Sequence, residues 1–202
     1  HMQKHIIIYI LDRFADWEGA YLASLLRNGE MGFNHHVSWA SYDKNPKSSL
    51  GSMTILPDIT TREISIDADA LILIGGDSWN SPEAKSIVPI VQKFKEQRKV
   101  LGFICDAARF AASEGLLNDV HHTGNSPEEM QGEMGYTNAE GFIMEDVVTD
   151  RNIITANGNS PVAFAVSILE ALDPESKKNL AMWQDFQLMG YWKALKKYGF
   201  LG

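Results

Sequence analysis

Short, continuously apolar stretches recur along this chain, and they constrain its fold more than any other feature. The clearest are residues 5–11, 68–74 and 100–104, which are rich in isoleucine, leucine and valine. A strand that is covered on both faces has such a sequence, whereas a half-exposed strand alternates apolar and polar residues. The sequence therefore predicts a parallel sheet that is buried on both sides.

Helical patterns lie between these predicted strands. Asp16 is a candidate N-cap for a helix from Trp17 to about Gly29. Because strands and helices alternate from residue 5 to residue 172, we expect an α/β sandwich with a mostly parallel sheet and helices on both faces. The remaining predicted elements are a strand at 36–40, a strand made of 142–144 with 147–148, a strand at 152–155, a helix at 107–117 and a helical tail at 174–202.

Charge and cysteine content exclude several classes of protein. The formal charge is −8, because 18 lysines and arginines face 26 aspartates and glutamates. Nucleic-acid binding requires a basic surface, so no nucleic-acid partner is expected. A single cysteine cannot form an internal disulfide, and no apolar run reaches the length of about 18 residues that a membrane helix needs. With no secretory signal visible, we expect a cytoplasmic protein without a membrane partner.

The stretch that is most informative about function follows the predicted strand 100–104. Cys105 comes directly after this strand, and small residues at the start of a helix follow it. This order is typical of a nucleophile elbow, in which a tight turn holds the reactive side chain at the end of a strand. The helix N-terminus would favour the thiolate, and the N–H group of Asp106 would point toward an oxyanion. The alternative is a small buried cysteine without a chemical role.

Three further features are expected at the same edge of the sheet. Gly75 and Gly76 follow a predicted strand, so their N–H groups could approach a substrate carbonyl. A carboxylate of Asp16-Trp17-Glu18 would lie beside the thiol, and a histidine of the pair His121-His122 is a candidate base. Each feature also has a plainer interpretation: an ordinary turn for the glycines, a helix-dipole interaction for the carboxylate, and a solvated loop for the histidine.

Signatures of cofactor binding are absent from the sequence. Neither G-x-G-x-x-G nor G-x-x-x-x-G-K-[ST] occurs, and there is no H-E-x-x-H motif. The adjacent pairs at 35–36 and 121–122 would point apart on a regular element, so neither pair chelates a metal by itself. We therefore expect no cofactor and no bound metal.

Several of these segments together resemble the ThiJ/PfpI family, which includes the parkinsonism-associated deglycase and archaeal intracellular proteases. The resemblance covers roughly residues 4–172 and rests on ICDA at 104–107, ASEGLL at 112–117, Gly75-Gly76, Glu18 and DRNIITANG at 150–158. It implies a flavodoxin-like sandwich, as a single class I glutamine amidotransferase-like domain over residues 1–202. It also implies a reactive Cys105, a carboxylate partner at Glu18, oxyanion N–H groups near Gly75 and Asp106, and a homodimer.

The predicted function is a cysteine-dependent hydrolase or lyase, amidotransferase-like or glyoxalase-like, that attacks a small carbonyl or amide compound through Cys105. One alternative is a redox-responsive protein without turnover, in which Glu18 hydrogen-bonds an oxidised Cys105. Another is a glutaminase-like subunit that needs a second protein as its synthase. Protease-like members of the family carry a histidine directly after the cysteine, where this chain has Asp106.

The predicted helical tail at 174–202 carries Trp183, Tyr191 and Trp192. It is expected to form one long helix or two short ones. Its aromatic side chains would pack either on the body of the same chain or on a second subunit.

Overall fold

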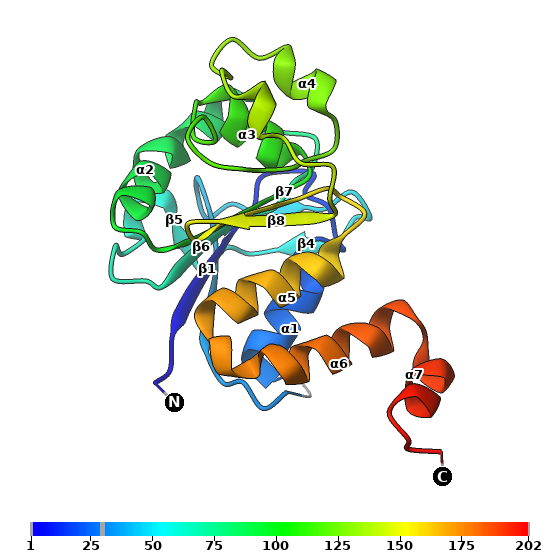
Figure 1. Cartoon of the computed structure of the whole chain (residues 1–202). Coiled ribbons are helices and arrows are strands. Elements are labelled where there is room, and N and C mark those ends of the chain that lie inside the picture. Colours follow the sequence, from blue (N-terminus) through cyan, green and yellow to red (C-terminus); the bar gives the residue numbers. More distant parts are fainter. Residues whose placement is uncertain (1, 29–30, 202) are drawn as a thin grey trace.

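A computed structural model describes residues 2–28 and 31–201 of the chain. Its centre is a seven-stranded sheet in the order β5-β2-β1-β6-β7-β9-β8 (Figure 1). Neighbouring strands are parallel except β8 and β9, which are antiparallel. The strands of this sheet are β1 (His5–Tyr9), β2 (His36–Ser41), β5 (Ile59–Thr60), β6 (Ala70–Leu73), β7 (Val100–Ile104), β8 (Val147–Asp150) and β9 (Ile153–Ala156). A separate small ladder pairs β3 (Lys47–Ser48) with β4 (Thr54–Ile55).

Helices cover both faces of the sheet, which confirms the predicted α/β sandwich (Figure 1). One face is covered by α2 (Val88–Glu96) and α3 (Asp106–Ser113), and α4 (Pro127–Gln131) packs on α3. The other face is covered by α1 (Ala20–Asn28) and α5 (Pro161–Leu172), and α6 (Lys177–Leu188) and α7 (Tyr191–Lys197) follow. The 3₁₀ segments are η1 (Thr61–Glu63), η2 (Pro82–Ile87), η3 (Ala139–Gly141) and η4 (Pro174–Ser176).

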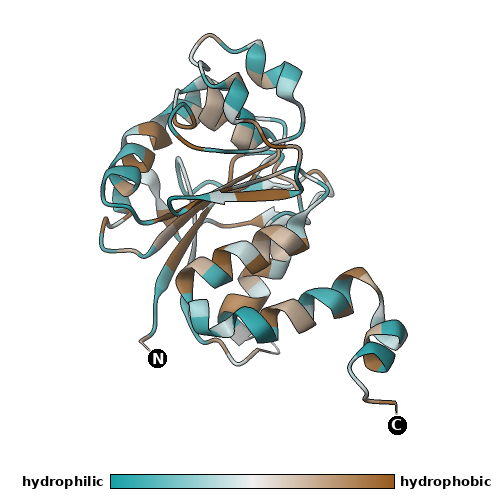
Figure 2. Cartoon of the chain, viewed as in Figure 1, coloured by the Kyte–Doolittle hydropathy of each residue, from teal (hydrophilic) through white to brown (hydrophobic). Residues whose placement is uncertain are grey.

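Strand β1 shows why its sequence is continuously apolar. Ile6 and Ile8 pack on the side of α1 and α5, whereas Ile7 and Tyr9 pack on the side of α2 and α3, and all four are fully buried. Successive strand side chains point to opposite faces, so one strand supplies two cores. Figure 2 shows the corresponding apolar colour along the central strands. Each such side chain contributes roughly 1.5–3 kcal/mol on burial.

One predicted element boundary near the first strand was wrong. The helix predicted from Trp17 begins at Ala20, because Asp16 does not cap it. The Asp16 carboxylate instead accepts hydrogen bonds from Ser49 Oγ at 2.6 Å and Gly51 N at 2.9 Å. The predicted end of this helix near Gly29 lies outside the described residues.

Later elements also differ from the prediction. Only the second part of the strand predicted at 142–144 and 147–148 forms, because β8 begins at Val147. In the first part, Phe142 makes only an isolated bridge with His122. Helix α3 ends at Ser113 rather than at 117, because Gly115 turns the chain with a φ of 74°. The tail forms two helices, as one of the two expectations stated. Helices long and apolar enough to span a bilayer are absent from the part of the chain that the structure describes.

Candidate active site

Cys105 lies between β7 and α3, at the carboxyl end of a central strand. Its backbone has a φ of 62° and a ψ of −130°, in a region that non-glycine residues rarely adopt. The Cys105 N–H donates to Ala156 O at 3.0 Å, which ties this strained residue to β9. The structure therefore has the predicted elbow geometry.

Glu18 is fully buried beside this thiol. Its Oε1 accepts a hydrogen bond from Gly75 N at 2.8 Å. Its Oε2 makes no hydrogen bond of ordinary geometry within the described residues, and the Cys105 thiol lies next to it. An orphaned buried carboxyl oxygen costs free energy unless it gains or shares a proton, so the thiol and the carboxyl form one unit.

Two glycines allow this close approach. A Cβ atom at Gly158 would lie 2.9 Å from Cys105 Sγ and 3.3 Å from Glu18 Oε2. A Cβ atom at Gly75 would lie 2.7 Å from both Cys105 Cβ and Glu18 Oε1. Any larger residue would therefore force the thiol and the carboxyl apart, or displace the strand end that holds them.

The two acids shift each other's proton affinity. Burial raises the pKa of Glu18 from 4.5 to about 7, against the opposing hydrogen bonds from Cys105 and Gly75. Burial, followed by the negative charge of Glu18, also raises the pKa of Cys105. At low pH the Glu18 carboxyl and the Cys105 thiol therefore hold two protons, and only one of them is released readily as the pH rises. The two titration steps belong to the pair rather than to either residue.

Asn125 is a residue of this site that the sequence did not assign. Its Nδ2 donates to Cys105 Sγ at 3.1 Å, and its Oδ1 accepts from Gly158 N at 2.8 Å. The Asn125 hydrogen bond lowers the pKa of Cys105, against burial and the charge of Glu18. The sequence offered one indication of this role, because Asn125 lies in the loop just after the histidine pair.

His122 is not brought to the thiol. It is fully buried, its Nδ1 contacts Val120 O at 2.8 Å, and its Nε2 contacts Tyr136 OH at 2.6 Å. Burial lowers its pKa. With both ring nitrogens occupied, His122 holds its loop in place, and it does not serve as the base that the sequence suggested.

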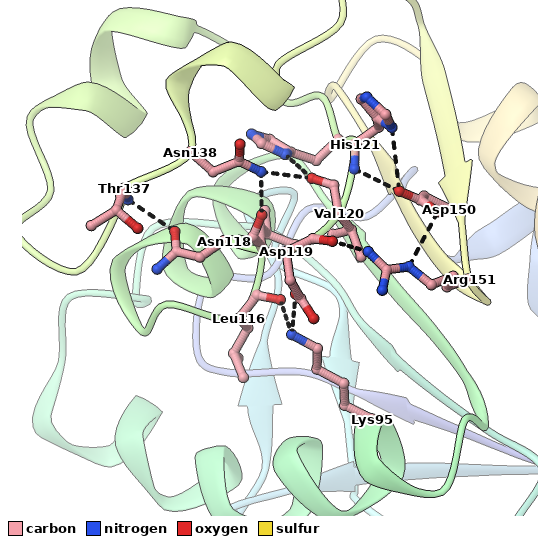
Figure 3. Close-up of polar contacts among 12 residues, drawn as sticks. Lys95, Leu116, Asn118, Asp119, Val120, His121, Thr137, Asn138, Asp150 and Arg151 are labelled. Atoms are coloured by element: carbon pink, nitrogen blue, oxygen red, sulfur yellow. Dashed lines mark hydrogen bonds and ion pairs between the residues drawn. The ribbon is translucent and has the colours of Figure 1, made fainter.

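The neighbouring His121 belongs to a surface network (Figure 3). Its backbone N–H donates to Asp150 Oδ2 at 2.7 Å, and its ring Nδ1 lies 3.4 Å from the same oxygen. Arg151 contacts Asp150 on the same side. The network anchors the 116–121 loop to the turn between β8 and β9, which is a structural role.

The negative charge of Asp106 is neutralised within α3. Arg109 donates from Nε to Asp106 Oδ1 at 2.6 Å, and from Nη1 to Glu133 Oε1 at 2.7 Å. The Asp106 carboxylate is therefore paired, and the Asp106 backbone N–H beside the sulfur lowers the pKa of the Cys105 thiol.

The backbone N–H groups that were predicted to bind an oxyanion differ in their surroundings. The Gly75 N–H is already bound to Glu18, so it is not free for a substrate oxygen. Gly76 adopts a φ of 150° beside Arg13, where a Cβ would lie 2.3 Å from a backbone oxygen. The Asp106 N–H, at the first position of α3, has no partner within the helix and lies beside the Cys105 thiol.

The sulfur opens into a cavity of about 400 Å³. Trp17 closes one side, and its Nε1 donates to Gly158 O at 2.8 Å. The side chains around the cavity are uncharged: Trp17, Cys105, Asn125, Asn157 and Asn159, with Gly158. In residues 2–28 and 31–201, no three histidine, cysteine, aspartate or glutamate side chains are grouped to hold a metal ion.

Comparisons with known proteins identify the family of this chain and agree with its fold. The model of the DJ-1/PfpI family matches residues 4–171. The chain is 33% identical over 196 residues to YdeA of Bacillus subtilis, named an uncharacterized protease, and covers 97% of both chains. It is 32% identical to a DJ-1 superfamily protein from Agrobacterium tumefaciens, with a TM-score of 0.80 and coverage of 90% of this chain and 97% of that one. A thiJ/pfpI family protein from Bacillus anthracis is 25% identical, with a TM-score of 0.88 and coverage of 93% and 91%.

Proposed function

The chain belongs to the DJ-1/PfpI family, and on this premise we propose that it is a cysteine-dependent enzyme acting on a small carbonyl or amide compound. The observation that carries the proposal is the contact between Glu18 and Cys105. A buried carboxyl whose pKa is raised to about 7 can accept and return a proton at neutral pH. It lies beside a thiol, which becomes a strong nucleophile when it loses that proton.

The first step transfers the thiol proton to Glu18 and forms the sulfur–carbon bond. The Cys105 S–H proton passes to the Glu18 carboxylate, and the thiolate attacks the substrate carbonyl carbon. The carbonyl π pair moves to its oxygen, which becomes an oxyanion. The Asp106 N–H stabilises this oxyanion, and the Asn125 Nδ2 stabilises the thiolate before attack.

The second step returns the proton. For an amide, protonated Glu18 donates its proton to the leaving nitrogen as the carbon–nitrogen bond breaks, and water then cleaves the thioester. For a dicarbonyl with an aldehyde carbon, the proton goes to the oxyanion and gives a thiohemiacetal. Glu18 then moves the hydrogen of the attacked carbon, as a proton, to the neighbouring carbonyl carbon through an enediol, which gives a hydroxy thioester. Water cleaves this thioester, releases a hydroxy acid and regenerates the Cys105 thiol. In both cases Glu18 ends in the protonation state in which it began.

The cavity supports a small uncharged substrate. Its volume of about 400 Å³ is at the lower end of ligand pockets, and no charged side chain lines it. The name protease belongs to the Bacillus relatives. In this chain Asn125, rather than a histidine, contacts the sulfur, so we favour a small molecule over a peptide.

A substrate panel tests the proposal. Small dicarbonyls and small amides are incubated with the wild type, Cys105→Ser and His121→Ala. We expect Cys105→Ser to lose at least about a thousandfold in turnover, because the nucleophile is lost. His121→Ala should keep wild-type turnover, because His121 lies in the surface network. Turnover that survives Cys105→Ser would contradict the proposal.

Redox sensing is the second candidate, and the polar groups around the sulfur favour it. Glu18 and Asn125 flank Cys105, so a protonated Glu18 and the Asn125 amide could both donate to an oxidised sulfur. Mass spectrometry after peroxide treatment distinguishes the two. Oxidation confined to Cys105, with no turnover across the panel, would support the sensor in place of the enzyme.

A further inference from the structure

Two histidines on neighbouring strands converge on one hydroxyl at the amino end of the sheet. His5 begins β1 and His36 begins β2, and the register of the two parallel strands pairs them directly. His5 Nε2 lies 2.8 Å from Ser38 Oγ, and His36 Nε2 lies 3.0 Å from the same oxygen. The two rings meet edge to face, with 4.3 Å between their centroids. We call these three side chains the amino-end site.

Strand geometry brings these side chains together. Residues two apart on a strand project from the same face, so His36 and Ser38 share one face of β2. His35 makes a different contact, because its Nδ1 accepts a hydrogen bond from Lys4 N at 3.0 Å. The adjacent histidines 35 and 36 therefore face different partners. The partner of His36 is His5 on the neighbouring strand, and no sequence motif reveals this contact.

The protonation of the two rings leaves a nitrogen lone pair at the amino-end site. A hydroxyl between two imidazoles accepts an N–H from one ring and donates its own proton to the lone pair of the other. Burial, followed by the charge of His36, lowers the pKa of His5, against the opposing charge of Asp69. His5 is therefore neutral at neutral pH. Neutral imidazole nitrogens are the commonest metal ligands in proteins.

The charges around the amino-end site favour a cation. Asp69 Oδ2 accepts a hydrogen bond from His5 N at 2.9 Å, so it places a negative charge beside the site. The ammonium group of the neighbouring Lys4 is held elsewhere, since it donates to Leu172 O. His36 is exposed, so an ion can reach the two rings from solvent.

The spacing of the polar atoms also suits a single ion. Two ligand atoms that lie about 2.0–2.1 Å from an ion, at a right angle to each other, are about 2.8–3.0 Å apart. The two nitrogen–oxygen distances at Ser38 are 2.8 and 3.0 Å. An ion can therefore bind both rings and the hydroxyl with little movement of the strands.

We propose that His5 and His36 bind one divalent ion of a late first-row transition metal through their Nε2 atoms, with Cu²⁺ held most tightly. Imidazole nitrogens suit Cu²⁺, Ni²⁺ and Zn²⁺, whereas Mg²⁺ and Ca²⁺ prefer oxygen ligands, and Cu²⁺ ranks first in affinity for a given site. The ring whose Nε2 carries a proton loses it from that atom and regains one at Nδ1 from water, so no net proton leaves the pair. The Ser38 hydroxyl and water complete the coordination.

The proposed site is small and separate from the thiol. Two protein nitrogens are consistent with the lack of any group of three ligating side chains in residues 2–28 and 31–201. Cys105 lies at the carboxyl end of β7, whereas His5 and His36 lie at the amino ends of β1 and β2. The proposal therefore does not depend on the chemistry at Cys105.

Calorimetric titration of the full chain with Cu²⁺ tests this proposal. We expect one Cu²⁺ to bind per wild-type chain, and His5→Ala and His36→Ala should each weaken this binding at least about tenfold, because the second imidazole is already in place and acts at a high effective concentration. Two controls should bind Cu²⁺ as the wild type does: His121→Ala removes an exposed histidine of the surface network, and Cys105→Ser removes the single thiol. A wild type that binds no Cu²⁺, tight binding that either alanine variant retains, or a loss of binding in Cys105→Ser would overturn the proposal.

Electron paramagnetic resonance of the bound Cu²⁺ tests the ligand set. The wild-type spectrum should show coupling to two nitrogens, and Mg²⁺ at the same concentration should not displace the ion. Thermal unfolding without metal verifies the fold of the variants. If His5→Ala is unstable, His36→Ala provides the test alone, because His36 is exposed. A spectrum without nitrogen coupling, a spectrum that is the same in the wild type and His36→Ala, or displacement by Mg²⁺ would overturn the assignment of the two histidines as ligands.

Discussion

Asn125 donates a hydrogen bond from its Nδ2 to the Sγ of Cys105 across 3.1 Å. The same side chain accepts the N–H of Gly158, so it also fixes the loop on the other side of the sulfur. An amide can stabilise a thiolate, but it cannot take a proton at neutral pH. In the proposed enzyme the base at this thiol is therefore Glu18, the titratable side chain with which the thiol is in contact.

Replacing Asn125 by leucine should make Cys105 harder to ionise. Hydrogen bonds to charged groups contribute about 1.5–3 kcal/mol, so the thiol pKa should rise by about one unit or more. The pH dependence of iodoacetamide alkylation measures this change. Asn159→Leu is the control, because Asn159 lines the same cavity while its N–H bonds to Asn157. Equal profiles for both variants would contradict the role of Asn125.

Glu18→Gln should stabilise the folded protein above neutral pH. The Glu18 pKa is about 7 in the folded state and 4.5 as its ordinary value, so the folded state binds the extra proton between these values. The free energy of unfolding of the wild type should therefore fall as pH rises from 4.5 to 7, by up to about 3 kcal/mol. Glu18→Gln should show no such fall.

Urea unfolding at pH 5 and pH 8 provides this measurement. The difference between Glu18→Gln and the wild type should be larger at pH 8 than at pH 5. Glu140→Gln, at an exposed glutamate, should show no difference at either pH. A wild type that is as stable at pH 8 as at pH 5 would argue against a buried, shared proton.

Gly158→Ala should block the site without preventing folding. The added Cβ would lie 2.9 Å from Cys105 Sγ, closer than real side chains approach. Alkylation and turnover should both fall by an order of magnitude or more, since small misplacements at a reacting centre cost about this much. Gly132→Ala should have little effect, because its Cβ would make only ordinary contacts. Full activity in Gly158→Ala would show that the sulfur is not confined as described.

Arg109→Met should expose Cys105 to the unpaired charge of Asp106. A negative charge beside a thiol raises its pKa, here by about one unit, so alkylation at pH 7 should slow. The double variant Arg109→Met and Asp106→Ala should recover most of the lost rate, because it removes the charge and keeps the Asp106 N–H. If the double variant is as slow as Arg109→Met, the effect comes from packing rather than charge.

Much of this fold could be predicted because its strands have simple requirements. Residues 6–9 must be apolar because both faces of the strand are buried, and a sequence pattern shows this directly. Cys105 could be placed because a buried strand runs straight into small helical residues. The start of α1 could not be predicted in this way. Asp16 binds Ser49 and Gly51, which are distant in the sequence, and no local pattern reveals that contact.

The partners of Cys105 were only partly predictable. Glu18 and Cys105 are far apart in the sequence and meet because β1 and β7 flank β6 in the sheet. The histidines were favoured as bases because imidazole commonly has that role. In the folded protein, however, the His122 ring hydrogen-bonds Tyr136, and Asn125 lies at the sulfur. Which loop side chain reaches a site depends on packing rather than on residue type.

The pH profile of alkylation at Cys105 tests most directly whether Glu18 and Cys105 share one proton. The chain has a single cysteine, so iodoacetamide incorporation reports on this thiol alone. In the wild type, the rate should rise through an inflection near pH 7, where the pair loses its first proton. Glu18→Gln and Glu18→Leu should both lose this inflection. The alkylation rate of Glu18→Gln should rise at a lower pH than that of Glu18→Leu, because the glutamine amide can still donate to the sulfur. If the wild-type rate instead rises only near pH 8.5, as for a free thiol of about that pKa, and both variants follow the same profile, the shared proton is refuted.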